Sequence, residues 1–311
     1  MAATFDAGPT GASADTALTG APAGARRGGA PGRLTAGGLL VGVATCAVIL
    51  VALAVRHGVV FGVVVLAVIF IPLEKLFALH PRRVLRPGWR TDVVHLLVNN
   101  LLSTVGLIVP VVTVGLGLRA LVPAGLHRAV GAQPVGAQLA EAVLLASLGG
   151  YAGHRAAHQI PWLWRFHKVH HSIRDMDWLA AGHLHPVDTV WTRSCTVIPV
   201  FALGFSRASF GALTVLLTFW AIFIHANVRW TFGPLRWLIA TPEFHHWHHA
   251  NEAAAHNTNY AAEFPWVDAL FGTLYLPVGV RPSRYGIDED EPSGYLRQLA
   301  WPFRPVTAPG R

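Results

Sequence analysis

The sequence predicts an all-α protein, a multi-pass transmembrane helical bundle with a histidine-rich cap on its cytoplasmic side. Three observations carry this prediction. Hydrophobic residues make up 53% of the 311 residues and charged residues only 13%, whereas an average soluble domain has about 25% charged residues. Several uncharged runs approach the ~20 residues that a helix needs to cross a bilayer. Finally, 13 of the 17 histidines lie between His154 and His256.

The N-terminal part of the chain is expected to contain a disordered segment followed by membrane helices. Residues 1–36 are rich in Ala, Gly, Thr and Pro and have little to bury, which is typical of disorder. Residues 37–135 are expected to form the N-terminal transmembrane helices. The apolar runs are 37–55, 57–73 with an extension toward residue 79, and 93–118.

The basic residues predict the orientation of these helices, because cytoplasmic flanks carry an excess of Lys and Arg. Arginines before the first run favour a cytoplasmic N-terminus, and the loop after the second run carries Lys75, Arg82, Arg83, Arg86 and Arg90. Residues 119–135 are then an outer loop, and residues 136–158 return to the cytoplasmic side. A helical hairpin is expected over residues 187–228, broken at 204–207 and entering and leaving on the cytoplasmic side.

Most of the clustered histidines are spaced three or four residues apart. Such residues share one face of a helix, so each cluster can direct several imidazoles to one point. Imidazole nitrogen suits Fe, Cu, Ni and Zn, and three clusters supply more ligands than one tetrahedral ion uses. The spacing therefore predicts a metal-binding cap with two metals. The clusters contain His154 and His158, then His167, His170 and His171, then His245, His248 and His249.

Other functional classes lack their signatures. The net charge of +8 lies beside apolar runs, where membrane orientation and anionic lipids account for it, so nucleic acid is not an expected partner. Cys46 and Cys195 do not form a Cys-x-x-Cys pair, which excludes zinc ribbons and thiol redox chemistry. The Glu-x-x-His motif of carboxylate-rich di-iron bundles occurs once, at Glu243, whereas those bundles use it twice.

A series of motifs from the fourth apolar run onward resembles the fatty acid hydroxylase/sterol desaturase superfamily. The resemblance covers roughly residues 150–277, and the combined motifs are highly specific although each alone is weak. They are His154-Arg-Ala-Ala-His158, Phe166-His-Lys-Val-His-His-Ser172, His185-Pro-Val-Asp188, Thr241-Pro-Glu-Phe-His-His-Trp-His-His249, Asn259-Tyr260 and Phe271-Gly-Thr273.

The resemblance implies a membrane-bound di-iron oxidoreductase that uses O₂ and two electrons to hydroxylate or desaturate a lipid C–H bond. Two non-haem Fe ions are the implied cofactors, and no bound NAD, FAD or haem is expected. Sterol, hopanoid, carotenoid and fatty acyl substrates all fit. Since no haem or flavin segment is recognisable, electrons are expected from a separate reductase with a cytochrome b5-like or ferredoxin-like carrier.

The expected site consists of metal ligands and a shell of supporting residues, with no catalytic residue assigned beyond the ligands. His225 is included because an ionisable residue in an apolar helix is a functional candidate, and His185 because of the resemblance. His183 departs from the Arg that is common in the family. The expected ligands are His154, His158, His167, His170, His171, His185, His225, His245, His248 and His249. The expected supporting residues are His183, Asp188, His256 and Asn259.

The domain boundaries and the alternatives follow from the same patterns. Residues 136–280 are expected to form the catalytic domain, and residues 281–311 a C-terminal tail. A membrane zinc metalloenzyme, or a non-catalytic metal-binding or transport protein, stays open as an alternative. A zinc hydrolase needs fewer histidines and a positioned carboxylate base. A transporter places ionisable residues along a membrane path, whereas here they gather at one face.

Overall fold

The computed structural model describes residues 58–304, and within that range it is helical. Only two isolated bridges, Ala78 with Val228 and Ala250 with Tyr285, have strand-like pairing there. The predicted helical class is therefore confirmed for these residues, while the segment 1–36 and the run 37–55 lie outside them. The α-helices are α2 (Gly58–Phe77), α3 (Trp89–Pro110), α4 (Leu116–Leu121), α5 (Ala124–Ala132), α6 (Val135–Gln159), α7 (Pro161–His171), α8 (Pro186–Leu203), α9 (Arg207–His225), α10 (Pro242–His248), α11 (Pro265–Leu270) and α12 (Tyr295–Ala300).

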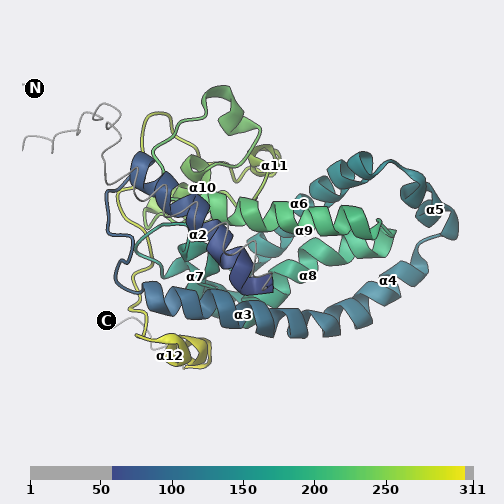
Figure 1. The fold of residues 1–311 in the computed structure, drawn as a ribbon, viewed down its shortest axis with the longest axis horizontal. Helices are drawn as coiled ribbons and strands as arrows, with labels where there is room; N and C mark the ends of the chain where they lie inside the picture. The colour runs from purple at the N-terminus through teal and green to yellow at the C-terminus, as the bar shows by residue number, and fades with distance from the viewer. Residues whose placement is uncertain (1–57, 305–311) are drawn as a thin grey trace, which may run out of the picture. The chain divides into compact units, whose positions relative to one another are not determined.

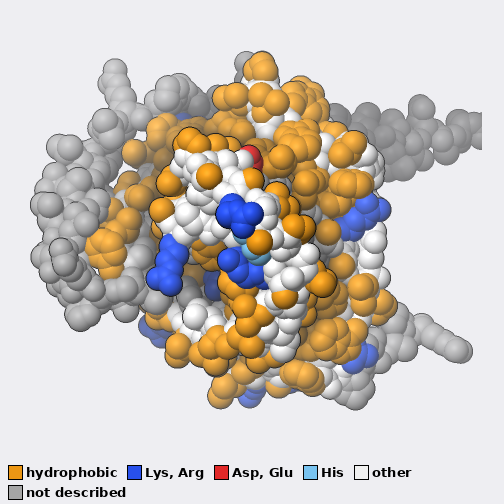
Figure 2. Space-filling model, turned by 90° about the vertical axis from the view of Figure 1, so that its right-hand side faces the viewer, with side chains coloured by type: hydrophobic (Ala, Val, Ile, Leu, Met, Phe, Trp, Pro, Cys, Tyr) orange, Lys and Arg blue, Asp and Glu red, His pale blue; other side chains and the backbone are white. Residues whose placement is uncertain are grey.

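Within residues 58–304, three helices are long and apolar enough to cross a membrane. They are Trp89–Leu121, which joins α3 to α4 through a π-helical turn at Val111–Gly115, then α6 and α9. They match the runs predicted at 93–118 and 136–158 and the second half of the hairpin. Large side chains such as Leu101 and Val109 are 67% and 65% exposed, which suits a surface in contact with lipid. Figure 2, seen from the α5 end, shows hydrophobic side chains over most of that face.

The long helices pack through small residues. On α6, Gly149 and Gly153 face Cys195 of α8 so closely that a Cβ at Gly149 would overlap the Cys195 carbonyl oxygen. Ala142 and Ala146 continue this side of α6 and are completely or almost completely buried. Small residues let helix backbones approach closely in a membrane. Close packing matters there, because the hydrophobic effect does not drive apolar helices together in lipid.

Short helices close one end of this bundle, and α5 lies at the opposite end (Figure 1). A proline at the first turn begins α7 and α10, where the missing N–H costs no helical hydrogen bond. Thr241 caps α10, its side chain accepting from the Phe244 backbone N–H. Because α7 follows α6 after a single corner, the histidines of both helices meet at this end.

The chain after the family-like motifs is ordered and packed. Its last α-helix, α12, lies against α3 (Figure 1). His95 Nε2 donates to Gln298 Oε1 at 2.7 Å, and the Tyr295 hydroxyl donates to Asn99 Oδ1 at 3.0 Å. Residues 281–303, called the C-terminal segment below, are therefore part of the folded unit in the structure, where the sequence suggested a tail.

Candidate metal centre

Two groups of histidines converge at the end of the bundle that carries α7 and α10. In each group, one nitrogen per residue lies within 4.8 Å of the others, and every ring is buried or half-buried. The rings come from α6, α7, α9 and α10, so helix packing brings together residues as distant in the sequence as His154 and His248. The first group contains His154, His158, His167, His171 and His248, and the second contains His170, His225, His245 and His249.

The second group has the spacing that a shared ion requires. Nε2 of His225 lies 3.2 Å from Nε2 of His170 and 3.1 Å from that of His245. His249 Nε2 lies 3.1 Å from His245 Nε2. Four nitrogens bound at about 2.0–2.1 Å to one ion stand roughly 3.3 Å apart at tetrahedral angles. The three separations are close to this value, so the four rings fit one metal ion.

The first group presents orphaned nitrogens to a common point. Nε2 of His154 and His167 are 3.1 Å apart. Nε2 of His158, His171 and His248 are buried and have no hydrogen-bond partner among the described residues. Buried polar atoms in native proteins are nearly always satisfied, so three orphaned imidazole nitrogens aimed at one place fit a metal ion as their missing partner.

The opposite ring nitrogen of five ligands is held by the protein. An N–H donated from Nδ1 leaves the Nε2 lone pair free for a metal and sets the plane of the ring. Four of these acceptors are backbone carbonyls and one is a carboxylate. His154 donates to Tyr260 O at 2.7 Å, His248 to Thr258 O at 2.8 Å, His170 to His183 O at 3.1 Å, His225 to Ala221 O at 2.6 Å and His167 to Asp188 Oδ1 at 3.0 Å.

Electrostatics keeps these imidazoles in the form that binds metal. Burial lowers the pKa of five of these rings well below the ordinary value, and the charge of neighbouring histidines lowers it further. The five are His170, His171, His245, His248 and His249. Neutral imidazole is the ligand, since protons compete with metal for the same lone pair. The lowered pKa of these five rings therefore favours metal binding over protonation.

One predicted ligand, His185, lies outside both groups. Its ring is 2% exposed, Nδ1 accepts from the Val187 backbone N–H at 3.1 Å, and Nε2 donates to Leu299 O at 3.1 Å. His185 is thus the N-cap of α8, and both ring nitrogens are already used. His185 therefore offers neither group a free nitrogen, and the motif that suggested it does not reveal which way its ring turns.

The four predicted supporting residues have different places. Asp188 accepts from His167, and Asn259 lies in the loop that carries two of the accepting carbonyls. His183 supports His170 through its backbone, while its ring is held between Asp92 Oδ1 at 2.6 Å and Glu291 Oε1 at 2.7 Å. Burial alone would lower the pKa of His183, but these two carboxylates raise it to about 9. His256 is exposed and has no such contact in the described structure.

Several functional positions carry no signal in the sequence. The carbonyls of Ala221, Thr258 and Tyr260 orient ligands, but any residue type supplies a carbonyl. His246 lies outside both groups and is buried between the Tyr285 hydroxyl and the His225 carbonyl. Only the Asn259-Tyr260 motif marked this region in advance.

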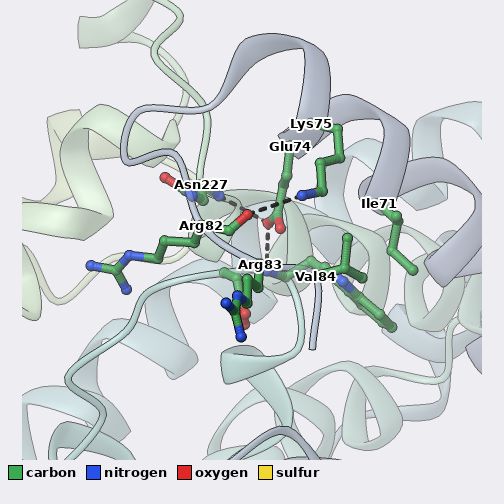
Figure 3. A pocket seen from close by; sticks show the side chains of 9 residues that line it. Ile71, Glu74, Lys75, Arg82, Arg83, Val84 and Asn227 are labelled. Atoms are coloured by element: carbon green, nitrogen blue, oxygen red, sulfur yellow. Dashed lines mark hydrogen bonds between the residues drawn. The ribbon is translucent and has the colours of Figure 1, made fainter. Parts of the chain in front are cut away.

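A polar surface pocket lies beside the histidine end and includes none of the grouped histidines (Figure 3). Its central side chain, Glu74, accepts from the backbone N–H of Asn227 at 2.9 Å and of Trp178 at 2.7 Å. Lys75 donates to Arg82 O at 3.0 Å across its rim. Because Asn227 follows His225 by two residues, this contact anchors the chain immediately after a ligand.

Comparisons with known proteins agree with this geometry. Residues 139–273 match the family model for fatty acid hydroxylase, and this range includes every histidine of both groups. The chain is 34% identical over 170 residues to ornithine lipid hydroxylase of Rhizobium tropici, which covers 55% of this chain and 51% of that protein. It is 30% identical to alkylglycerol monooxygenase of Homo sapiens, covering 43% of this chain and 29% of that protein.

A third relative is the very-long-chain aldehyde decarbonylase of Oryza sativa subsp. indica, 28% identical over 40% of this chain and 47% of that protein. The chain thus spans about half the length, or less, of these relatives. No solved structure matches.

Proposed function

Because residues 139–273 match the fatty acid hydroxylase family model, we propose that this chain is an iron-dependent membrane oxygenase of the fatty acid hydroxylase/sterol desaturase superfamily, acting on a lipid C–H bond. The observation that carries the proposal is the pair of converging histidine groups, five rings and four rings, at the end of apolar helices. The two groups together contain nine histidines, whereas one tetrahedral zinc ion uses four ligands. This excess favours a two-iron centre over the zinc alternative.

The proposed cofactor is a pair of Fe ions, one in each group. Iron held by nitrogen ligands supplies, with O₂ and two electrons, the power to remove hydrogen from an unactivated carbon. The protein's part is to fix the rings and keep the site dry. Nδ1 donation to backbone carbonyls orients the rings of His154, His170, His225 and His248. Burial of the rings excludes competing water.

The proposed substrate is a membrane lipid, and hydroxylation is the proposed outcome in preference to desaturation. Two of the three relatives described above are named as a hydroxylase and a monooxygenase of lipids. The apolar surface of α3 and α9 suits a substrate that arrives from the bilayer. The identity of the oxidised lipid product will distinguish fatty acyl, sterol, hopanoid and carotenoid substrates. Electrons are proposed to come from a separate reductase and carrier.

The experiment is untargeted lipid analysis of cells that express or lack the protein, grown under ¹⁸O₂. We expect a lipid that gains one labelled oxygen atom with the wild type and none with His248→Ala, which removes a proposed ligand. Glu141→Gln is the matched control, because Glu141 is an exposed contact of Gln133 near the start of α6, whereas His154 and His158 lie near its end. A product lighter by two hydrogens would instead indicate desaturation.

Metal analysis tests the same proposal independently. Purified protein produced with ample iron should hold about two ions per chain, since each group offers one ion enough nitrogen ligands. Zinc in such protein does not decide the matter, because zinc binds nitrogen sites more tightly than iron. Full lipid activity in protein that is free of iron would contradict the proposal.

A further inference from the structure

The first histidine group depends on one short loop. His154 comes from α6 and His248 from α10, yet both donate to carbonyls of the same loop, at Tyr260 and Thr258. Asp268 holds this loop by accepting from the backbone N–H of Tyr260 at 2.8 Å and of Ala261 at 2.9 Å. It is fully buried, and Thr273 Oγ1 also donates to it at 2.7 Å. One carboxylate thus sets two ligands of one group.

The middle residue of the loop is also held firmly. Asn259 has φ of +58°, and its side chain donates to the carbonyls of Phe244 at 3.0 Å and Tyr275 at 2.7 Å. Its Oδ1 accepts from the Tyr275 backbone N–H at 2.8 Å. Asn adopts a left-handed conformation more readily than most residues. The two carbonyls on either side of Asn259 are therefore presented in a fixed direction.

The second group depends on a different part of the chain. The C-terminal segment pairs with the end of α10, where Gly286 N donates to His249 O at 3.3 Å. Next to it, the Tyr285 hydroxyl donates to His246 Nδ1 at 3.0 Å, and His246 Nε2 donates to His225 O at 3.3 Å. The backbones of His249 and His225, two ligands of the second group, are thus held by this segment.

The same segment reaches a third ligand of the second group. Glu291 accepts from His183 Nε2, and the His183 carbonyl accepts from His170 Nδ1. The segment starts after residue 273, where the match to the family model ends. The family model therefore does not describe this support.

We infer that the two histidine groups are separately supported half-sites, the first positioned by the 258–261 loop with Asp268 and the second by the C-terminal segment through Gly286, Tyr285 and Glu291. Either ion is then removable while the other stays bound. The inference rests on the proposed function only in taking both groups as ion sites. It assigns Asp268 and Gly286 as positioning residues, since neither touches the ion.

Two substitutions test it in the full-length protein. In Asp268→Asn, an amide N–H replaces a carboxylate oxygen and faces a backbone N–H of the loop, at Tyr260 or Ala261. Two donors cannot pair, so we expect the loop carbonyls to shift and the first group to lose its ion. Gly286→Ala places a methyl group at φ +98°, 3.1 Å from Arg174 Cγ, which displaces the segment from His249. We expect each variant to hold half the metal of the wild type, counted by mass spectrometry on monodisperse protein.

Double variants identify which ion is lost. Combined with His248→Ala in the first group, Asp268→Asn should lower the metal content no further than His248→Ala alone. Asp268→Asn combined with His245→Ala, in the second group, should remove nearly all of the metal that His245→Ala alone retains. Gly286→Ala should give the opposite pattern. Arg284→Ala, which removes an exposed contact of the same segment with Asp288, is the matched control and should keep the full content.

The outcomes separate the inference from the proposed function. Metal content is measured after loading with Fe²⁺ and, separately, with Zn²⁺. If the protein binds two zinc ions but oxidises no lipid, the proposed function is wrong, and the metal content of the variants still tests the half-sites. Thr273→Val, which removes one donor to Asp268, gives a milder first-group change if Asp268→Asn does not elute as folded protein. Loss of both ions in folded Asp268→Asn or Thr273→Val, or a wild type with a single ion, overturns the inference.

Discussion

His185 illustrates how a histidine in a metal-like motif can serve the backbone instead of the metal. It caps α8 through Nδ1 and has no nitrogen left for an ion. We therefore expect His185→Asn, which keeps a capping acceptor, to retain the wild-type metal content. His185→Ala should also keep metal but lose about 0.5–2 kcal/mol of stability, the usual value of an N-cap. Metal counting and thermal unfolding check both variants.

A drop in metal for His185→Asn while its melting temperature is unchanged would make His185 a ligand after all. The matched comparison is His245→Ala, which removes a ring of the second group and should lower the metal content directly. Comparing the metal content of the His185 and His245 variants distinguishes a residue that caps a helix from one that binds an ion.

Glu263 should make stability depend on pH. It lies in the loop after Ala261, and burial raises its pKa from 4.5 to about 7. The folded state thus holds a proton that the unfolded state releases between pH 4.5 and 7, and stability falls as pH rises through that window. Glu263→Gln should flatten this decline and raise the melting temperature at pH 7.

Thermal unfolding in detergent at several pH values measures the effect, with Glu141→Gln as an exposed control. An unchanged pH profile in Glu263→Gln would mean that another group titrates in this range. The carboxyl does not contact the grouped histidines in the described structure, so metal content should stay constant in both variants.

Helix α6 depends both on its apolar sequence, which sets its length, and on its packing against α8. Its apolar length was predictable, but its close contact with α8 was not. Gly149→Ala should separate the two helices, because its Cβ has no room beside the Cys195 carbonyl. Overpacking of this kind costs about 1–3 kcal/mol. We expect a lower melting temperature and, because α6 carries His154 and His158, weaker metal retention.

Gly150→Ala is the neighbouring control on the same helix. Its Cβ would lie 3.5 Å from Thr196 Oγ1, an ordinary contact, and Ala favours the helix by up to ~1 kcal/mol over Gly. This variant should unfold at the wild-type temperature or slightly above. Equal loss in both variants would show that helix α6 does not depend on the contact at Gly149.

For the whole molecule, the arginine distribution predicts that the histidine end is cytoplasmic and that α5 is outside. Ala124 in α5 and Ala253 near α10 are both exposed, so a cysteine at either position can react. In a Cys46→Ser/Cys195→Ser background, an impermeant thiol reagent should label Ala124→Cys in intact cells and should label Ala253→Cys only after lysis. Labelling of Ala253→Cys from outside would invert the topology.

The sequence by itself determined the helical class, three of the apolar helices and the set of nine histidines that gather in two groups. These features are local, because hydrophobic length and spacings of three or four residues act within one helix. The tertiary structure alone decided how the histidines divide into groups, why His185 turns away, and that Asp268 and residues 281–303 hold the rings. Those contacts join backbone carbonyls to side chains far along the chain, and a carbonyl is the same in every residue, so no sequence pattern marks them.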